Sequence, residues 1–163
     1  MKRAFVFTDE FTQVLGKFHS NWSIIDVHVD YAIYKFLGVT AFQAHLITSG
    51  MVFGRKIRLL VDIIKHSDDR RKSDLLRVLG QITGANRELV THSYIRSEPD
   101  SVTFLTRISS GTFTAKERTF TRDEFIALSQ ELYEAGIEFR RLLGATREEL
   151  DAFAKAALRA NRS

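Results

Sequence analysis

The sequence predicts a mainly α-helical domain, an antiparallel helical bundle with one β-hairpin inserted at about residues 102–120. Three observations predict this fold. Apolar residues near the start of the chain recur at alternating steps of four and three, the period of a helix that buries one face. Between residues 102 and 120 the period changes to two, which is typical of strands. Three capping boxes mark helix starts at Thr40, Thr121 and Thr146.

Composition narrows the class of protein. The 163 residues are enough for one domain, so we take residues 1–163 as a single unit. No apolar run approaches the ~20 residues of a membrane span, and no signal peptide is recognisable, so we expect no membrane partner. Cysteine is absent, which excludes disulfides and fits a cytoplasmic location. The net charge of +4 permits nucleic-acid binding without requiring it.

The first helix is expected from about Thr8 to Leu37. Its main apolar stripe contains Phe11, Leu15, Phe18, Trp22, Ile25, Val29, Ala32 and Phe36. A second stripe contains Ile24, Val27, Tyr31 and Tyr34. A helix with two apolar stripes must bury both, and a second copy of a chain this small could cover one of them. The sequence therefore predicts a homodimer that uses the long helices.

The middle of the chain is expected to form two more helices before the hairpin. The first of these runs from Thr40 to about His66, with Gly50 and Gly54 on one face, where close helix packing would offset their low helix propensity. The second runs from about Asp74 to Tyr94. It is ended by Ser97–Asp100, because the residue before a proline avoids helical angles.

After the hairpin, the helical period returns. A helix is expected from Thr121, with Gly144 ending it, and a last helix from Thr146 to about Arg159. The apolar positions that should face inward on the first of these two helices are Phe125, Leu128, Leu132, Phe139 and Leu142.

One cluster resembles a metal site in composition but not in geometry. Asp26 and Asp30 would share a helix face, whereas His28 would point about 200° away from Asp26. We therefore predict no metal site, and with no Gly-rich phosphate loop in the sequence we expect no cofactor.

A second cluster, residues 87–94, carries the functional interpretation. It reads Arg87, four residues, His92, one residue, Tyr94, a spacing expected about 0.01 times by chance. Here the sequence resembles the HEPN superfamily, whose ribonuclease members carry Arg-x4–6-His late in a bundle helix. A toxin branch of that family carries Arg-x4-His-x-Tyr. The order of long helices, motif, hairpin and capped helix over about residues 40–143 is also similar.

The resemblance implies a metal-independent endoribonuclease that cleaves RNA at a dimer cleft. Arg87 and His92 would be the catalytic residues. Tyr94 would be regulatory or would orient the substrate, because in the toxin branch a nucleotidyltransferase antitoxin attaches nucleotide to the matching tyrosine. Such an antitoxin is thus an expected partner of this chain.

The residue types suit that chemistry. Histidine can act as acid or base near neutral pH, and the arginine fork fits a phosphate. Tyrosine can stack on a base. On an ideal helix, however, Arg87 and His92 lie about 140° apart. The two side chains can converge only if the helix ends or kinks near His92, or if a two-fold partner supplies its own copy.

Two alternatives stay open at this stage. Many active HEPN members have Asn, Asp or His directly after the arginine, whereas this chain has Glu88, with Asn86 before the arginine. Both are candidate auxiliary residues, and Glu88 also favours a catalytically silent module that binds a nucleotide, nucleic acid or protein. In the plainest alternative, Arg87 pairs with an acid, His92 caps the helix end and Tyr94 packs with its hydroxyl at the surface.

Overall fold

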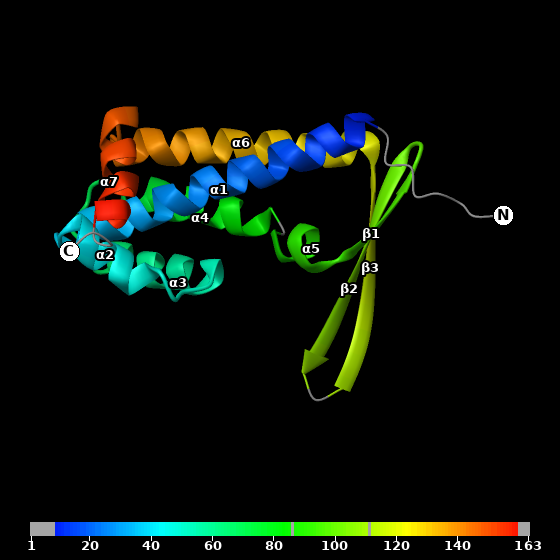
Figure 1. The fold of residues 1–163 in the computed structure, drawn as a ribbon, viewed down its shortest axis with the longest axis horizontal. Coiled ribbons are helices and arrows are strands. Elements are labelled where there is room, and N and C mark those ends of the chain that lie inside the picture. Colours follow the sequence, from blue (N-terminus) through cyan, green and yellow to red (C-terminus); the bar gives the residue numbers. More distant parts are fainter. Residues whose placement is uncertain (1–8, 86, 111, 160–163) are drawn as a thin grey trace.

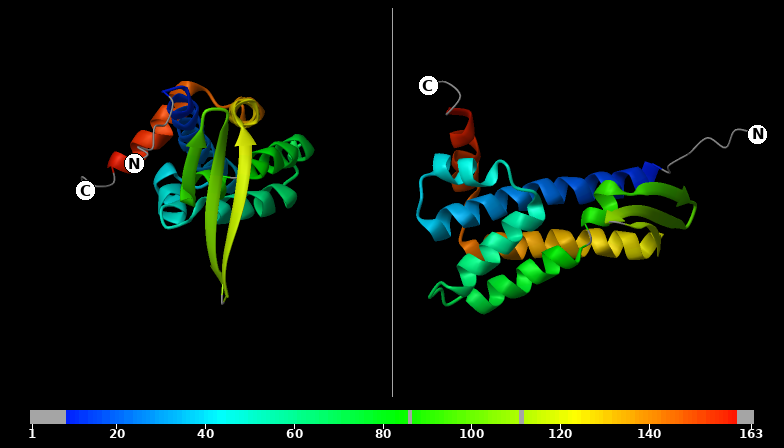
Figure 2. Two further views of the ribbon diagram at one scale, coloured as in Figure 1. Left: turned by 90° about the vertical axis from the view of Figure 1, so that its right-hand side faces the viewer. Right: turned by 90° about the horizontal axis from the view of Figure 1, so that it is seen from below.

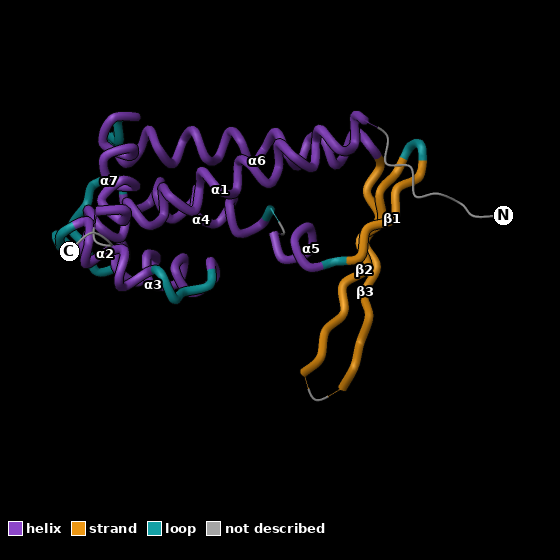
Figure 3. Tube along the Cα trace, viewed as in Figure 1, coloured by secondary structure: helices purple, strands orange, loops and turns teal. Residues whose placement is uncertain are grey.

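The computed structural model describes residues 9–85, 87–110 and 112–159. The chain is mainly helical and carries one three-stranded antiparallel sheet in the order β1-β2-β3. Figure 1 shows the sheet at one end of the helices, and Figure 3 separates the two kinds of structure by colour. The elements are α1 (Asp9–Leu37), α2 (Ala41–Thr48), α3 (Phe53–Lys65), α4 (Lys72–Gly84), α5 (Arg87–His92), β1 (Tyr94–Glu98), β2 (Ser101–Ser110), β3 (Thr112–Thr121), α6 (Arg122–Leu143) and α7 (Arg147–Arg159).

The two longest helices, α1 and α6, lie side by side and run in the same direction (Figures 1 and 2). An ion pair between Glu10 and Arg122 joins their first turns. Gly136 brings the two helices close together, since a Cβ at this position would lie 3.0 Å from Cγ1 of Ile25. The predicted main stripe of α1 faces this contact, and its central members from Phe18 to Ala32 are buried.

Helices α3 and α4 complete the helical part of the core. Lys56 of α3 is only 6% exposed, and its Nζ lies 3.1 and 3.2 Å from the two carboxylate oxygens of Asp26 and 3.0 Å from Oδ2 of Asp30. The two aspartates therefore share a face of α1, as predicted, and bind a lysine there. Phe53 packs edge-on against Trp22, with ring centroids 4.7 Å apart.

The helix expected from Thr40 to His66 is in fact two helices, so that prediction was wrong. The capping box at Thr40 is present, but α2 ends at Thr48 and α3 begins at Phe53. The two helices pack on different partners, α2 on α1 and α7 and α3 on α1 and α4, so the chain must bend between them. Gly50 lies in the bend, and no atom lies within 4 Å of a Cβ built there or at Gly54. Neither glycine therefore makes the close helix contact that we expected.

The helix expected from Asp74 to Tyr94 is also divided. Helix α4 covers Lys72–Gly84, the six-residue α5 covers Arg87–His92, and Tyr94 already belongs to a strand. This strand, β1, was not predicted. It pairs with β2 from Tyr94 opposite Leu105 to Glu98 opposite Ser101, so that the proline-containing segment forms a hairpin turn and does not simply end a helix.

Where the sequence predicts one hairpin, the structure has a three-stranded antiparallel sheet, in which β2 and β3 pair from Ser101 opposite Thr121 to Ser110 opposite Thr112. One face of the sheet packs on the helices through Phe104 and Phe120, whose rings contact Phe125 of α6. The outer half of the two long strands extends away from the helices (Figure 1).

The last two helices begin and end as predicted. Thr121 caps α6, Gly144 ends it with φ +64°, and Thr146 caps α7. Phe153 of α7 covers Tyr31 and Tyr34, with ring centroids 5.7 and 5.3 Å apart. Half of the second stripe of α1 is thus covered within the chain. The other half remains at the surface, with Ile24 52% exposed and Val27 37% exposed.

Within the described part of the chain, none of the helices combines the length and the apolar character that crossing a membrane requires.

Candidate functional site

Helix α5 lies between the other helices and the sheet, and it carries the first two residues of the predicted motif, Arg87 and His92. Arg87 is its first residue and His92 its last. The structure gives the backbone of Arg87 and Glu88, whose side chains lie outside the described residues, and Asn86 lies wholly outside them. Val90, on the same helix, is 2% exposed and joins the main core, so that α5 is fixed against the rest of the molecule.

His92 is exposed where the helix ends. A straight helix running on past His92 would have kept the imidazole and the Arg87 side chain on different faces. Because α5 stops at His92, the chain can change direction directly after the histidine. The change of direction comes after the histidine, however, so Arg87 and His92 both lie within α5 and their positions remain on different faces of this helix.

A pair of hydroxyls fixes the end of α5 to the sheet. The Oγ of Ser93 lies 2.6 Å from Oγ1 of Thr106, one residue before the register of β1 and β2 begins. His92 precedes this link on one chain segment and Arg107 follows it on the other, where α5 contacts β2. Arg107 is exposed. No functional role for Arg107 is predicted from the sequence.

Tyr94, the last residue of the motif, begins β1 and is 53% exposed. It lies opposite Leu105, and alternation along the strands places Arg96 and Arg107 on the same face as these two residues. This is the face turned away from the helices, toward the viewer in the left view of Figure 2. We call it the outer face of the sheet.

Arg96 is not among the site residues that the sequence predicts, and there is a physical reason for this. The alternation that places Leu105 and Arg107 on one face is visible in the sequence. The sequence pattern predicts a helix around Tyr94, however. That Arg96 shares a face with Leu105 and Arg107 can be recognised only once β1 is known to pair with β2.

A groove between α4 and α6 lies close to the start of α5. It has a volume of about 490 Å³ and reaches Ala85 at the end of α4. Its lining includes three carboxylates and one arginine, namely Glu131, Glu134, Glu138 and Arg77. The excess of negative charge is unfavourable for a phosphate backbone, so we do not place a nucleic acid here.

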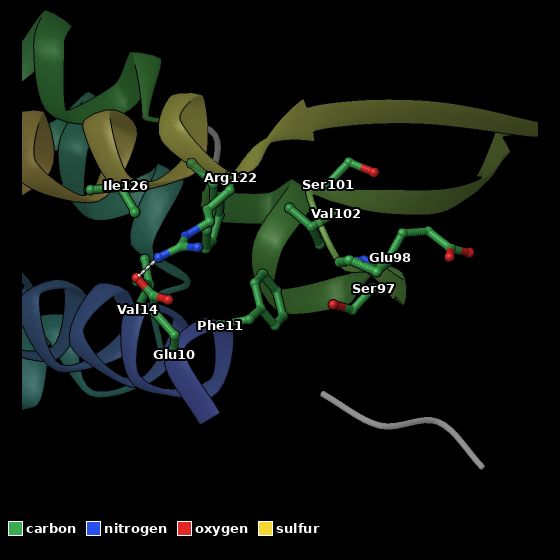
Figure 4. A pocket seen from close by; sticks show the side chains of 11 residues that line it. Glu10, Phe11, Val14, Ser97, Glu98, Ser101, Val102, Arg122 and Ile126 are labelled. Atoms are coloured by element: carbon green, nitrogen blue, oxygen red, sulfur yellow. Dashed lines mark hydrogen bonds and ion pairs between the residues drawn. The ribbon is translucent and has the colours of Figure 1, made fainter. Parts of the chain in front are cut away.

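A smaller cavity of about 80 Å³ lies where the sheet meets the two long helices (Figure 4). Glu10 and Arg122 form an ion pair across it, and the turn between β1 and β2 forms one wall. The cavity joins three elements that are far apart in the sequence. Because the cavity is small and an ion pair crosses it, we interpret it as a packing contact between the sheet and the two long helices.

A third hollow, of about 210 Å³, lies between α1 and α6, near the middle of these helices. The His28 side chain forms part of its wall and is 5% exposed. Burial, and secondarily the nearby Arg140, lower the pKa of His28 to about 4, so the imidazole is neutral at pH 7. On α1 it points away from the carboxylates that hold Lys56, where burial raises the pKa of Asp30.

In the described residues, no three histidine or acidic side chains are grouped closely enough to hold a metal ion. No family model matches the chain, and neither a curated protein nor a solved structure matches it.

Proposed function

We propose that this chain is a metal-independent endoribonuclease with an HEPN-type helical bundle fold, which cleaves single-stranded RNA beside the junction of α5 and β1. The observation that carries the proposal is the end of α5 at His92. The histidine is exposed there, two residues before Tyr94, which is exposed on the outer face of the sheet.

Cleavage without a metal ion uses the 2′-hydroxyl of the RNA as nucleophile. Its oxygen bonds to phosphorus while the bond from phosphorus to the 5′-oxygen breaks. A base takes the 2′-hydroxyl proton, and an acid supplies a proton to the leaving oxygen. His92 is the group in the motif that can fill either role near neutral pH. Arg87 is the proposed phosphate ligand, whose charge would stabilise the transition state.

The proposal includes a homodimer whose two copies form the cleft together. Support comes from a row of exposed apolar residues over α1 and α6, in contact with the 210 Å³ hollow, namely Ile24, Tyr133 and Ile137. Burying such a row against a second copy is favourable. Sedimentation at micromolar concentration should give about twice the mass of the 18.7 kDa chain, and Ile137→Glu should give a monomer.

Control of the enzyme by a nucleotidyltransferase antitoxin is part of the same proposal. The Tyr94 oxygen would bond to the α-phosphorus of ATP, losing its proton and releasing pyrophosphate, and the attached nucleotide would place a phosphate next to the RNA site, where like charge would repel the substrate. Support comes from the exposure of Tyr94. Incubation with ATP and a nucleotidyltransferase encoded next to this chain should add one nucleotide in intact-mass analysis, and Tyr94→Phe should remove the addition.

The cleavage test uses purified protein, single-stranded RNA and EDTA. We expect products that end in a cyclic phosphate and no cleavage of DNA, which lacks the 2′-hydroxyl. His92→Ala should slow cleavage by about 10²–10⁴-fold without unfolding the protein, because the side chain is exposed. His66→Ala is a matched control, since His66 is also exposed but lies at the end of α3. Cleavage that is absent, or that His92→Ala leaves unchanged, contradicts the proposal.

A catalytically silent binding module is the second candidate, and Glu88 favours it. This residue follows Arg87 where many active members of the resembled family carry Asn, Asp or His. Glu88→Asn separates the two candidates. If the silent module is correct, the wild-type chain binds RNA without cutting it, and the substitution restores cleavage.

A further inference from the structure

We propose that the outer face of the sheet is a binding platform for single-stranded RNA. Tyr94 stacks on a base, while Arg96 and Arg107 contact the phosphates on either side of it. The platform deepens the proposed ribonuclease function, on which it rests, by naming the residues that bring the strand to His92.

The positions of the three side chains follow from the register of the sheet. Tyr94 is opposite Leu105, Arg96 is two residues further along β1, and Arg107 is two residues beyond Leu105 on β2. Residues two apart on a strand point to the same side, and diagonal neighbours on adjacent strands are about 7–8 Å apart. The tyrosine ring therefore lies between two arginines. All three side chains are exposed, and in the left view of Figure 2 no described helix lies in front of the sheet.

Charge on this face is arranged around the tyrosine. Arg96 and Arg107 are its nearest charged neighbours on the face, one toward each end of the strands. The carboxylates on the same face are further away, since Glu98 lies beyond Arg96 and Glu117 lies on β3, on the far side of Leu105. An aromatic ring between permanent positive charges fits a nucleic-acid strand, which presents bases and phosphates in alternation. The acidic groove between α4 and α6 has an excess of carboxylates, so its charge is not complementary to the phosphates of RNA.

The platform leads to the proposed catalytic histidine. His92 precedes Ser93 and Arg107 follows Thr106, so the two residues flank the link between the Ser93 and Thr106 hydroxyls. A strand whose base stacks on Tyr94 and whose next phosphate contacts Arg107 thus carries a phosphodiester toward His92. Arg107 is a positioning residue in this arrangement, because it acts by holding the strand.

Binding should be measured apart from cleavage with a fluorescent 12-nucleotide 2′-O-methyl oligouridine, whose blocked hydroxyl prevents cleavage. Removing one phosphate contact from a single strand lowers the slope of log affinity against log salt by about 0.7, which is about a fivefold loss at 0.1 M salt. Arg96→Gln and Arg107→Gln should each show this loss. Arg147→Gln is the matched control, because this exposed arginine begins α7 at the opposite end of the molecule.

Stacking is tested at Tyr94. Tyr94→Leu should weaken binding by about fivefold or more, because stacking on an aromatic ring contributes substantially for each base. Tyr94→Phe should stay within about twofold of wild type, since it keeps the ring. Glu117→Gln should strengthen binding, because it removes a negative charge from the platform. A DNA oligonucleotide of the same length should bind within about tenfold, because neither stacking nor phosphate contact reads the 2′-hydroxyl.

The outcomes separate this inference from the ribonuclease proposal. If Arg96→Gln and Arg107→Gln bind as tightly as Arg147→Gln, the platform is wrong even when wild-type protein cleaves RNA. If both lose affinity and the salt slope falls, the platform is supported even when no cleavage is found. Absence of any binding at 50 mM salt also overturns the platform.

Discussion

The helical core and the sheet end of this molecule differ in how they use their large side chains. Along α1 and α6, aromatic and branched residues such as Phe18, Ile25 and Phe139 are almost completely buried. At the sheet end, Phe104 is buried against the helices, but Tyr94 and the arginines beside it face outward. Buried apolar area is the main source of folding free energy, and exposed charge contributes little to it. We therefore expect substitutions in the core to change stability, and substitutions on the outer face to change binding and chemistry.

The largest stability effect is expected for Phe139→Ala. Phe139 is completely buried, so its loss should lower the free energy of unfolding by about 3–5 kcal/mol. Tyr94→Ala removes a ring that is largely exposed and should cost less than about 1 kcal/mol. Urea unfolding followed by circular dichroism measures both changes. If the two variants lost equal free energy of unfolding, the expected difference between the helical core and the outer face would be contradicted.

A smaller loss is expected for Lys56→Met. The substitution leaves Asp26 and Asp30 without their cation, and removing one partner of a buried ion pair typically costs about 3–5 kcal/mol. We expect about 2–4 kcal/mol here, because the Asp26 side chain reaches solvent. The loss should shrink as the pH falls, because burial raises the pKa of the Asp30 carboxyl and a protonated Asp30 no longer needs a cation. Arg58→Met, on an exposed position of the same helix, should have little effect at any pH.

His28 should make the core sensitive to acid. Its folded pKa of about 4 lies below the ordinary value of 6.5, so the unfolded chain binds the proton more tightly. The stability that neutral His28 contributes is complete above pH 6.5 and is lost as the pH falls toward 4. We expect a loss of about 1–3 kcal/mol between pH 7 and pH 4.

The raised pKa of Asp30 acts in the opposite sense, because ionising this carboxyl costs stability as the pH rises. Comparison with His28→Gln isolates the contribution of the histidine. The variant should show a flatter dependence of unfolding free energy on pH, and an unchanged dependence would remove His28 as the cause. Cleavage of RNA at pH 7 should be unaffected, since His28 belongs to the core.

A small stability effect is expected for Ser93→Ala. This substitution removes one hydroxyl pair and should cost about 0.5–1.5 kcal/mol. Cleavage of RNA should nevertheless fall several-fold, because the link with Thr106 fixes the segment that carries His92 to β2. Thr83→Ala removes a hydroxyl that is bonded to a carbonyl within α4 and should leave cleavage unchanged. Equal activities for the two variants would show that the Ser93 link does not position the site.

The long helices could be predicted from the sequence because their signals are local and repeated. The apolar stripe of α1 and the capping boxes at Thr40, Thr121 and Thr146 each depend on residues three or four apart. The bend at Gly50 and the division before Arg87 could not be predicted in this way. Both depend on which helix packs against which neighbour. Where the packing partner changes, a helix ends at residues of low helix propensity.

The site was predicted only in part for a related reason. The order of Arg87, His92 and Tyr94 can be read directly from the sequence. That Tyr94 lies on a strand is a property of the sheet, since a five-residue strand gains its hydrogen bonds only from β2. Arg96 and Arg107 come together through that pairing, which no local pattern reports.

The parallel contact between α1 and α6 also has a consequence for synthesis. About 106 residues separate the end of α1 at Leu37 from the end of α6 at Leu143. A ribosome adds about 5–20 residues per second, so the partner of α1 is completed roughly 5–20 s after α1 itself. Throughout that interval the part of the stripe around Phe18 lacks its α6 partner Phe125 on the nascent chain. We expect this segment to be the region of the protein that chaperones bind during translation.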